Sequence, residues 1–202
     1  MRKVAAIGIG QTKVSEQWNK SLKELAGDAI LNALIDANIR EFDSLFIGNM
    51  MSASANQQQN IGAYIADWVG ARGAESIRIE SACSSGSTAF RAAVLAVASN
   101  EAEVAVAAGV EKMTDSPGDE ITANLATAAD ADWEVSHGVS FVALNALIMQ
   151  RYLHEYKWDH SNFADFSINA HKNAMTNPNA RFHSELTQEQ FDNSPVICDP
   201  IT

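Results

Sequence analysis

Short apolar segments alternate with runs of helical periodicity through the first half of the chain. Four segments have the composition of buried strands and end near glycine or small polar residues: 3–9, 43–49, 76–82 and 103–109. The last of them is apolar enough to be covered on both faces. Because strands separated by helices favour βαβ units, the pattern predicts an α/β fold with a largely parallel sheet.

The segments between these strands carry helix signals. Ser21 and Glu24 have the spacing of a capping box, and apolar residues then recur at helical spacing up to Ala37. Residues 61–68 place their apolar side chains on one helical face. Residues 84–98 are apolar on nearly every side, which is typical of a buried helix.

The second half of the chain has a different character. From residue 114 to residue 139 it is polar and acidic, and two helices are then expected over residues 141–156 and 162–175. No strand is evident in this half. We therefore expect a sheet domain over residues 1–113 and a mostly helical domain over residues 114–202.

Composition and charge exclude several classes of function. The 202 residues carry 14 basic and 25 acidic side chains, a net charge of -11, and the basic ones are scattered, so we expect no nucleic-acid partner. No apolar run reaches the roughly 18 residues that cross a bilayer, and the N-terminus lacks the apolar region of a signal peptide. Two cysteines form no disulfide framework and close no zinc site. We expect a cytoplasmic protein with no membrane partner and no bound metal.

Cys83 is the strongest candidate for chemistry. It follows a predicted strand and precedes a predicted helix, where unpaired N–H groups and the helix dipole favour the thiolate, the nucleophilic form of the side chain. Ligands of open α/β sheets gather at the carboxyl ends of strands, and the small residues 84–86 leave room for a substrate. The alternative is a buried small hydrophobic residue, which is the role of most free cysteines.

Three motifs resemble those of the thiolase superfamily. Residues 81–87 (SACSSGS) are similar to its nucleophile motif, although ketoacyl synthases carry a similar Ala-Cys-Ser-Ser. Residues 109–114 (GVEKMT) look like the thiolase signature G-x-E-x-M-[ST]. Residues 182–187 (FHSELT) and 193–196 (NSPV) resemble the close of the thiolase loop domain, and residues 177–180 (NPNA) are similar to sterol-carrier-protein-type and archaeal thiolases in particular.

This resemblance implies a fold, an activity and a class of substrate. It implies a thiolase-like N-terminal half: a mixed, mostly parallel sheet domain that bears the nucleophile, followed by a helical loop domain. The activity implied is that of an acyl-CoA C-acyltransferase of lipid metabolism, similar to acetyl-CoA acetyltransferase, in which Cys83 forms an acyl-enzyme during a reversible Claisen condensation. Coenzyme A thioesters are then substrates, and no covalently bound cofactor is expected. The alternatives are 3-hydroxy-3-methylglutaryl-CoA synthesis, a retro-aldol lyase reaction, or a non-catalytic assembly subunit.

The resemblance also implies a partner. A thiolase subunit is about twice as long, and its second half carries a histidine in a G-H-P motif, an acid/base cysteine and an Asn-x-His oxyanion element. No histidine of this chain precedes a proline, and Cys198 lies outside any Cys-x-Gly setting. We therefore expect a heteromer with a separately encoded C-terminal thiolase-half chain, and a dimer of such pairs.

The remaining polar candidates carry weaker signals. His137 loosely matches a loop-domain residue that lines the acyl pocket in thiolases, and the alternative is a solvated loop histidine. Glu111 is expected to order the loop after the fourth predicted strand rather than to act as an acid. Because coenzyme A carries phosphates, basic residues should line its approach, and no motif chooses among the candidates Arg151, Lys172 and Arg181.

Overall fold

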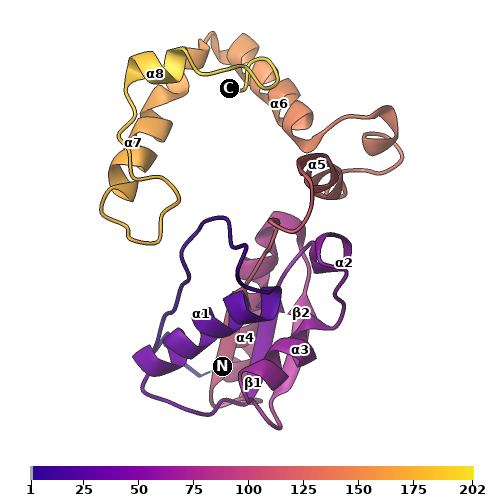
Figure 1. Cartoon of the computed structure of the whole chain (residues 1–202), viewed down its shortest axis with the longest axis vertical. Coiled ribbons are helices and arrows are strands. Elements are labelled where there is room, and N and C mark those ends of the chain that lie inside the picture. The colour runs from indigo at the N-terminus through magenta and orange to yellow at the C-terminus, as the bar shows by residue number, and fades with distance from the viewer. Residues whose placement is uncertain (1) are drawn as a thin grey trace. The chain divides into compact units, whose positions relative to one another are not determined.

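The computed structural model describes residues 2–202, which form two compact units (Figure 1). The sheet unit comprises the described residues up to Thr12 together with residues 16–121, and the helical unit comprises residues 13–15 and 122–202. The domain boundary expected between residues 113 and 114 therefore lies inside the sheet unit.

Three parallel strands form the sheet: β1 (Ser44–Gly48), β2 (Glu75–Ile79) and β3 (Ala105–Gly109). The strand order is β2-β1-β3, and Ser44 is in register with both Glu75 and Ala105. Every residue of the central strand β1 is buried. The parallel α/β architecture that the sequence predicts is thus confirmed.

Residues 3–9 do not form the strand that their apolar sequence predicts. Between its two ends, the backbone of this segment forms no hydrogen bond with another described residue. At one end Arg2 N–H donates to Ala98 O at 3.2 Å, and at the other Ile9 N–H donates to Asp36 Oδ2 at 2.9 Å. A strand exists only where a neighbour completes its ladder of hydrogen bonds, so the described sheet has three strands instead of the expected four.

The helices of the sheet unit are α1 (Leu22–Asp36), α2 (Ser52–Ala55), α3 (Ile61–Trp68) and α4 (Ser85–Ser99). Only the short α2 has no counterpart among the predicted helices. The capping box predicted for α1 is confirmed, because Ser21 Oγ accepts from the backbone N–H of Glu24 at 3.4 Å and Ser21 N–H donates to the Glu24 carboxylate at 2.7 Å.

Side chains of β1 alternate between the two faces of the sheet, and each face has its own apolar cluster. Leu45 and Ile47 pack with α1 and α3 on one face. Phe46 packs with the alanines of α4, including Ala89 and Ala93, on the other face. The sheet is therefore covered on both sides, which is the usual condition of a parallel sheet.

The helical unit contains α6 (Phe141–Tyr156), α7 (Ala164–Ala174) and α8 (Gln188–Asp192), with 3₁₀ turns η2 (Val135–His137) and η3 (His160–Phe163). α5 (Gly118–Ala126) crosses the boundary between the two units. α6 and α7 confirm the two helices predicted here, whereas α5 and α8 were not predicted. Among the described residues, no helix combines the length and the apolar composition needed to cross a membrane.

Asp43 joins the starts of the three strands. Its carboxylate accepts hydrogen bonds from the backbone N–H groups of Val104 at 3.0 Å and Glu103 at 2.8 Å, and these bonds hold the pKa of Asp43 below its ordinary value of 3.8. Its backbone carbonyl accepts from Glu75 N–H at 2.9 Å. Asp43 thereby connects β1 with both of its neighbours.

The lowered pKa of Asp43 predicts a pH-dependent contribution to stability. A carboxyl whose folded-state pKa is lowered stabilises the fold above its unfolded pKa, and this contribution is lost as the pH falls through the folded pKa. We expect Asp43→Asn to lower the midpoint of urea unfolding at about pH 6. The difference in midpoint between the variant and the native chain should become smaller towards about pH 2. The control is Asp67→Asn, because no described residue donates a hydrogen bond to the Asp67 carboxylate. A difference for Asp43→Asn that does not change with pH would contradict the prediction.

Candidate active site

Cys83 lies at the junction between a strand end and a helix start. β2 ends at Ile79, the 3₁₀ turn η1 covers Ala82–Ser84, and α4 begins at Ser85. The Cys83 side chain is exposed. The strand-to-helix position expected for Cys83 is therefore present, and the thiol is not a buried packing residue.

Hydrogen bonds among three serines hold the turn around Cys83. Ser85 Oγ accepts from Ser81 N–H at 2.9 Å and donates to Ala82 O at 2.6 Å. Ser84 Oγ donates to Ser81 O at 2.7 Å. Between them Ala82 has a φ of 45°, in the left-handed region that costs a non-glycine residue about 1 kcal/mol or more. The hydrogen bonds of the serines hold Ala82, the residue directly before Cys83, in this strained conformation. Backbone strain of this kind is concentrated at active sites.

The backbone N–H of Cys83 is available to a ligand, unlike those of its neighbours. Ala82 N–H donates to Glu80 Oε1 at 2.5 Å, and Ser84 N–H donates to Ser81 O at 3.0 Å. Among residues 2–202, none accepts from Cys83 N–H. Because this donor lies beside the positive end of the α4 dipole, it is suited to bind a negatively charged oxygen.

Glycines let the first turn of α4 rest directly on the ends of two strands. Gly48 ends β1 and Gly109 ends β3. A Cβ atom at Gly48 would lie 2.5 Å from Ser85 O and 2.6 Å from Gly86 Cα, and one at Gly109 would lie 3.5 Å from Gly86 Cα. These backbone contacts determine the distance between the start of α4 and the sheet, and therefore the position of Cys83. No motif in the sequence marks Gly48 as a site residue.

We expect Gly48→Ala to displace the start of α4, because the atoms that the new Cβ meets belong to the backbone and have no flexible end to yield. Overpacking of this kind costs about 1–3 kcal/mol. The midpoint of urea unfolding should fall accordingly, and the rate of alkylation of Cys83 by iodoacetamide should change by about an order of magnitude. Gly118→Ala is the matched control, since a Cβ at Gly118 meets nothing within 4 Å. If Gly48→Ala changes neither the stability nor the alkylation rate, the contact between residue 48 and the start of α4 does not determine the position of Cys83.

Glu111 connects the loop after β3 with the loop after β1. Its carboxylate accepts from Asn49 Nδ2 at 2.7 Å, from Met50 N–H at 2.9 Å and from Met51 N–H at 3.1 Å. Arg78 adds to this arrangement by donating to Asn49 O at 3.1 Å and to Met50 O at 2.6 Å. Glu111 was expected to order the loop after β3, in which it stands, and its carboxylate instead orders the loop after β1, 60 or more residues away.

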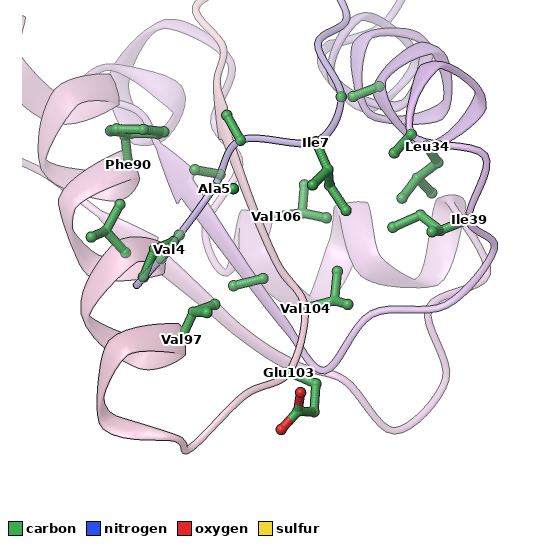
Figure 2. A pocket seen from close by; sticks show the side chains of 18 of the residues that line it. Val4, Ala5, Ile7, Leu34, Ile39, Phe90, Val97, Glu103, Val104 and Val106 are labelled. Atoms are coloured by element: carbon green, nitrogen blue, oxygen red, sulfur yellow. The ribbon is translucent and has the colours of Figure 1, made fainter. Parts of the chain in front are cut away.

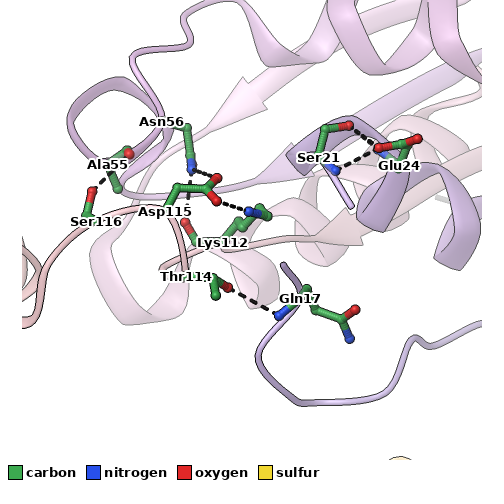
Figure 3. Close-up of polar contacts among 9 residues, drawn as sticks. All are labelled: Gln17, Ser21, Glu24, Ala55, Asn56, Lys112, Thr114, Asp115 and Ser116. Carbon is green, nitrogen blue, oxygen red and sulfur yellow. Dashed lines mark hydrogen bonds and ion pairs between the residues drawn. The ribbon is translucent and has the colours of Figure 1, made fainter. Parts of the chain in front are cut away.

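The residues that follow Glu111 are fixed onto α2 (Figure 3). The ammonium of Lys112 is buried and forms an ion pair with Asp115. Asn56 Nδ2 donates to Lys112 O at 3.0 Å, and Ser116 Oγ donates to Ala55 O at 3.1 Å. Lys112 is thus a packing residue, and these contacts hold the segment after β3 against α2.

The other predicted site residues lie in the helical unit. His137 ends the turn η2, is exposed, and its ring forms no hydrogen bond with a described residue. Arg151 pairs with Glu155 at 2.8 Å on α6. Lys172 is in the last turn of α7, and the Arg181 guanidinium lies 5.8 Å from the ring centre of Phe182.

Metal-ligating residues do not cluster in the part of the chain that the structure describes. No group of three or more His, Cys, Asp and Glu side chains within residues 2–202 is arranged to hold a metal ion. The Cys198 side chain is partly exposed, and the backbone of Cys198 pairs with that of Ile201 in an antiparallel β-bridge.

Comparisons with known proteins agree on one family. The family model described as "Thiolase, N-terminal domain" matches residues 3–199. The chain is 39% identical to the "Acetyl-CoA acetyltransferase" of Methanothermobacter thermautotrophicus and 38% identical to that of Methanocaldococcus jannaschii. Each alignment covers 100% of this chain and 52% or 51% of the relative. The chain therefore spans about half the length of the curated relatives it matches.

A solved structure has a similar fold. The "Ltp2-ChsH2(DUF35) aldolase" superposes with a TM-score of 0.73 at 25% sequence identity. The match covers 96% of this chain and 50% of that chain. The likeness therefore extends over both the sheet unit and the helical unit, and again over only half of the larger molecule.

Proposed function

Because the chain belongs to the family of thiolase N-terminal domains, we propose that it carries the nucleophile of an acyl-CoA C-acyltransferase of the acetyl-CoA acetyltransferase type. The observation that carries this proposal is the exposed thiol of Cys83, held at the N-terminal end of α4 by a strained turn. The names of the two archaeal relatives support the same activity.

In the proposed reaction the Cys83 thiolate attacks the thioester carbonyl of an acyl-CoA. A bond forms between sulfur and the carbonyl carbon, and the Cys83 N–H donates to the resulting oxyanion. Collapse of this intermediate breaks the bond to the coenzyme A sulfur, which takes up the proton that Cys83 lost. A carbanion formed from a second acyl-CoA then attacks the acyl-enzyme carbonyl, which yields a 3-oxoacyl-CoA and restores the thiolate.

The proposed reaction needs groups that this chain does not supply. A base must deprotonate Cys83, and an acid/base must serve the α-carbon of the second acyl-CoA. We place both on a separately encoded chain that corresponds to the half of the relatives this chain does not span, with two such pairs forming a dimer. The proposed heteromer would act in the cytoplasm, in lipid metabolism.

Contacts to coenzyme A form part of the same proposal. Its phosphates call for basic side chains, and the helical unit offers Arg151, Lys172 and Arg181. His137 would line the acyl group. Among these, Arg151 would have to exchange its Glu155 partner for a phosphate oxygen.

A retro-aldol lyase is the second candidate, because the solved structure that superposes on this chain is an aldolase. The two reactions differ at Cys83. A retro-aldol cleavage breaks a carbon–carbon bond without an acyl-enzyme, whereas the proposed acyl transfer passes through one. The state of the Cys83 sulfur during turnover therefore distinguishes them.

The test is mass spectrometry of the chain after incubation with acetoacetyl-CoA and coenzyme A. The chain is first assembled with a complementary half, taken from the Methanothermobacter relative. The proposal predicts an acetyl group, an addition of about 42 Da, on the peptide that contains Cys83. Acetylation of Cys198 instead, or no acetylation in an assembled complex, would overturn it.

A further inference from the structure

Two peptide planes meet at Ala82, and the angle between them sets the direction of the Cys83 N–H. The first plane joins Ser81 to Ala82 and contains the Ala82 N–H. The second joins Ala82 to Cys83 and contains both the Ala82 carbonyl and the Cys83 N–H. Both peptide bonds are trans, so each plane is rigid. Only φ and ψ of Ala82 can therefore turn the Cys83 N–H relative to the end of β2.

The second plane is held from the start of α4. Ser85 Oγ donates to the Ala82 carbonyl at 2.6 Å, and the Ser85 backbone N–H bonds to the same oxygen. In a trans peptide the C=O and the N–H point in opposite directions. The Ala82 carbonyl thus points towards Ser85, and the Cys83 N–H points away from it.

The first plane is held by Glu80. Its carboxylate oxygen Oε1 accepts from the Ala82 N–H at 2.5 Å. The Glu80 residue is exposed, and among residues 2–202 its carboxylate has no other hydrogen-bond donor and no ion-pair partner. The only polar contact of this side chain within the described chain is thus with the residue that carries the backbone strain.

The Glu80 contact opposes the relaxation of Ala82. A non-glycine residue with a φ of 45° is strained, and it keeps this conformation only where surrounding bonds outweigh the strain. Hydrogen bonds to a charged acceptor are roughly twice as strong as those between neutral groups. Without the Glu80 carboxylate, the Ala82 N–H could turn to water, and only the Ser85 bonds would hold the residue.

We propose that Glu80 is a positioning residue for the acyl-transfer reaction, an inference that rests on the proposed function. Acting through Ala82, its carboxylate fixes the direction in which the Cys83 N–H meets the oxyanion formed from the thioester carbonyl. A donor of this kind is effective when it is already aligned with the position that the negative oxygen will occupy. Glu80 and Ser85 together provide this alignment before the substrate arrives.

Glu80 acts here through its oxygen atom rather than through its charge. A nearby negative charge disfavours both a thiolate and an oxyanion, and both form at Cys83, three residues further along the chain. An uncharged amide oxygen at the same place would therefore hold Ala82 without this disadvantage. An amide cannot take up a proton as a base does, so the same substitution separates positioning from acid/base chemistry.

The experiment compares variants of this chain, each assembled with the complementary half of the Methanothermobacter relative. Glu80→Gln keeps an acceptor oxygen on a side chain of equal length and should retain at least about half of the native kcat for thiolysis of acetoacetyl-CoA. Glu80→Ala removes the acceptor, and kcat should fall by about tenfold to a hundredfold, since complete loss of one oxyanion donor costs about 10²–10³. KM should change by less than about twofold in both variants, because the oxyanion exists only beyond the bound ground state.

Glu75→Ala is the matched control. Glu75 is an exposed acid at the opposite end of β2, and no described residue donates a hydrogen bond to its carboxylate. The control removes the same side chain from the same strand without touching Ala82. It should retain the native kcat.

A crystal structure of the assembled Glu80→Ala variant gives a readout that needs no activity. We expect Ala82 to leave the left-handed region and the Cys83 N–H to turn with it. Glu80→Gln should retain the φ of the native Ala82. An unchanged Ala82 in Glu80→Ala would overturn the positioning role.

The kinetic outcomes separate this inference from the proposed function. Native activity in Glu80→Ala would overturn the positioning role. An equal loss in Glu80→Gln and Glu80→Ala would also overturn it, because the carboxylate would then act through its charge or its proton. If Ala82 relaxes in Glu80→Ala but the native complex never acetylates Cys83, the contact between Glu80 and Ala82 is supported and the proposed activity is refuted.

Discussion

Substitution of Cys83 by serine should abolish acyl transfer by the assembled enzyme. A serine hydroxyl is a far weaker nucleophile than a thiolate because it is almost fully protonated at neutral pH, so kcat should fall by at least about three orders of magnitude. The fold should be unaffected, since Cys83 is exposed and the change replaces one atom. The measurement is thiolysis of acetoacetyl-CoA by the chain together with its complementary half.

Cys198→Ser is the matched control for this loss. Cys198 is the other cysteine of the chain and is partly exposed, so the variant repeats the chemical change at a site with no proposed role. It should retain the activity of the native chain. If Cys83→Ser keeps more than about a tenth of the native rate, Cys83 is not the acyl carrier.

The isolated chain should self-associate. Phe90 of α4 is 57% exposed and Ile9 is 80% exposed, although α4 was expected to be buried. Soluble monomers seldom expose contiguous apolar patches beyond a few hundred Å², and each 400 Å² left in water forgoes about 10 kcal/mol. Size-exclusion chromatography with light scattering should therefore give masses above 21.8 kDa that fall on dilution.

Paired variants locate the surface that drives this association. Phe90→Ser removes an apolar ring that lines the cavity between residues 2–8 and β3 (Figure 2). Ile35→Ser removes a side chain that is 75% exposed on α1 and does not line that cavity. We expect Phe90→Ser to shift the chain towards monomer and Ile35→Ser to have little effect. A native chain that stays monomeric at every concentration, with a cooperative melt, would contradict the prediction.

Local patterns predicted most elements of this fold. α6 has the predicted bounds, and the capping box at Ser21 starts α1. Both depend on hydrogen bonds and side-chain spacing within about four residues, which a single sequence displays. The junction that holds Cys83 was found for the same reason, because a strand signal ends just before it and a helix signal begins just after.

The residues that support Cys83 were harder to find. Gly48 matters because its missing Cβ lets α4 approach the end of β1, and Glu111 matters because its carboxylate reaches Asn49 and Met50. Each contact joins residues far apart in the sequence. Gly48 has no local signal that distinguishes it from an ordinary strand end. The GVEKMT motif marks Glu111 but does not indicate which loop its carboxylate reaches.

By itself, the sequence determined where the five helices α1, α3, α4, α6 and α7 lie, that the sheet is parallel, where the nucleophile candidate stands and which family its motifs resemble. Only the tertiary structure decided that residues 3–9 form no strand, that Glu111 holds the loop after β1, and that β3 keeps a free edge beside an apolar cavity. The physical reason is the range of the interactions. Helical hydrogen bonds close within one turn, whereas a strand acquires its partner from a distant part of the chain or from another chain.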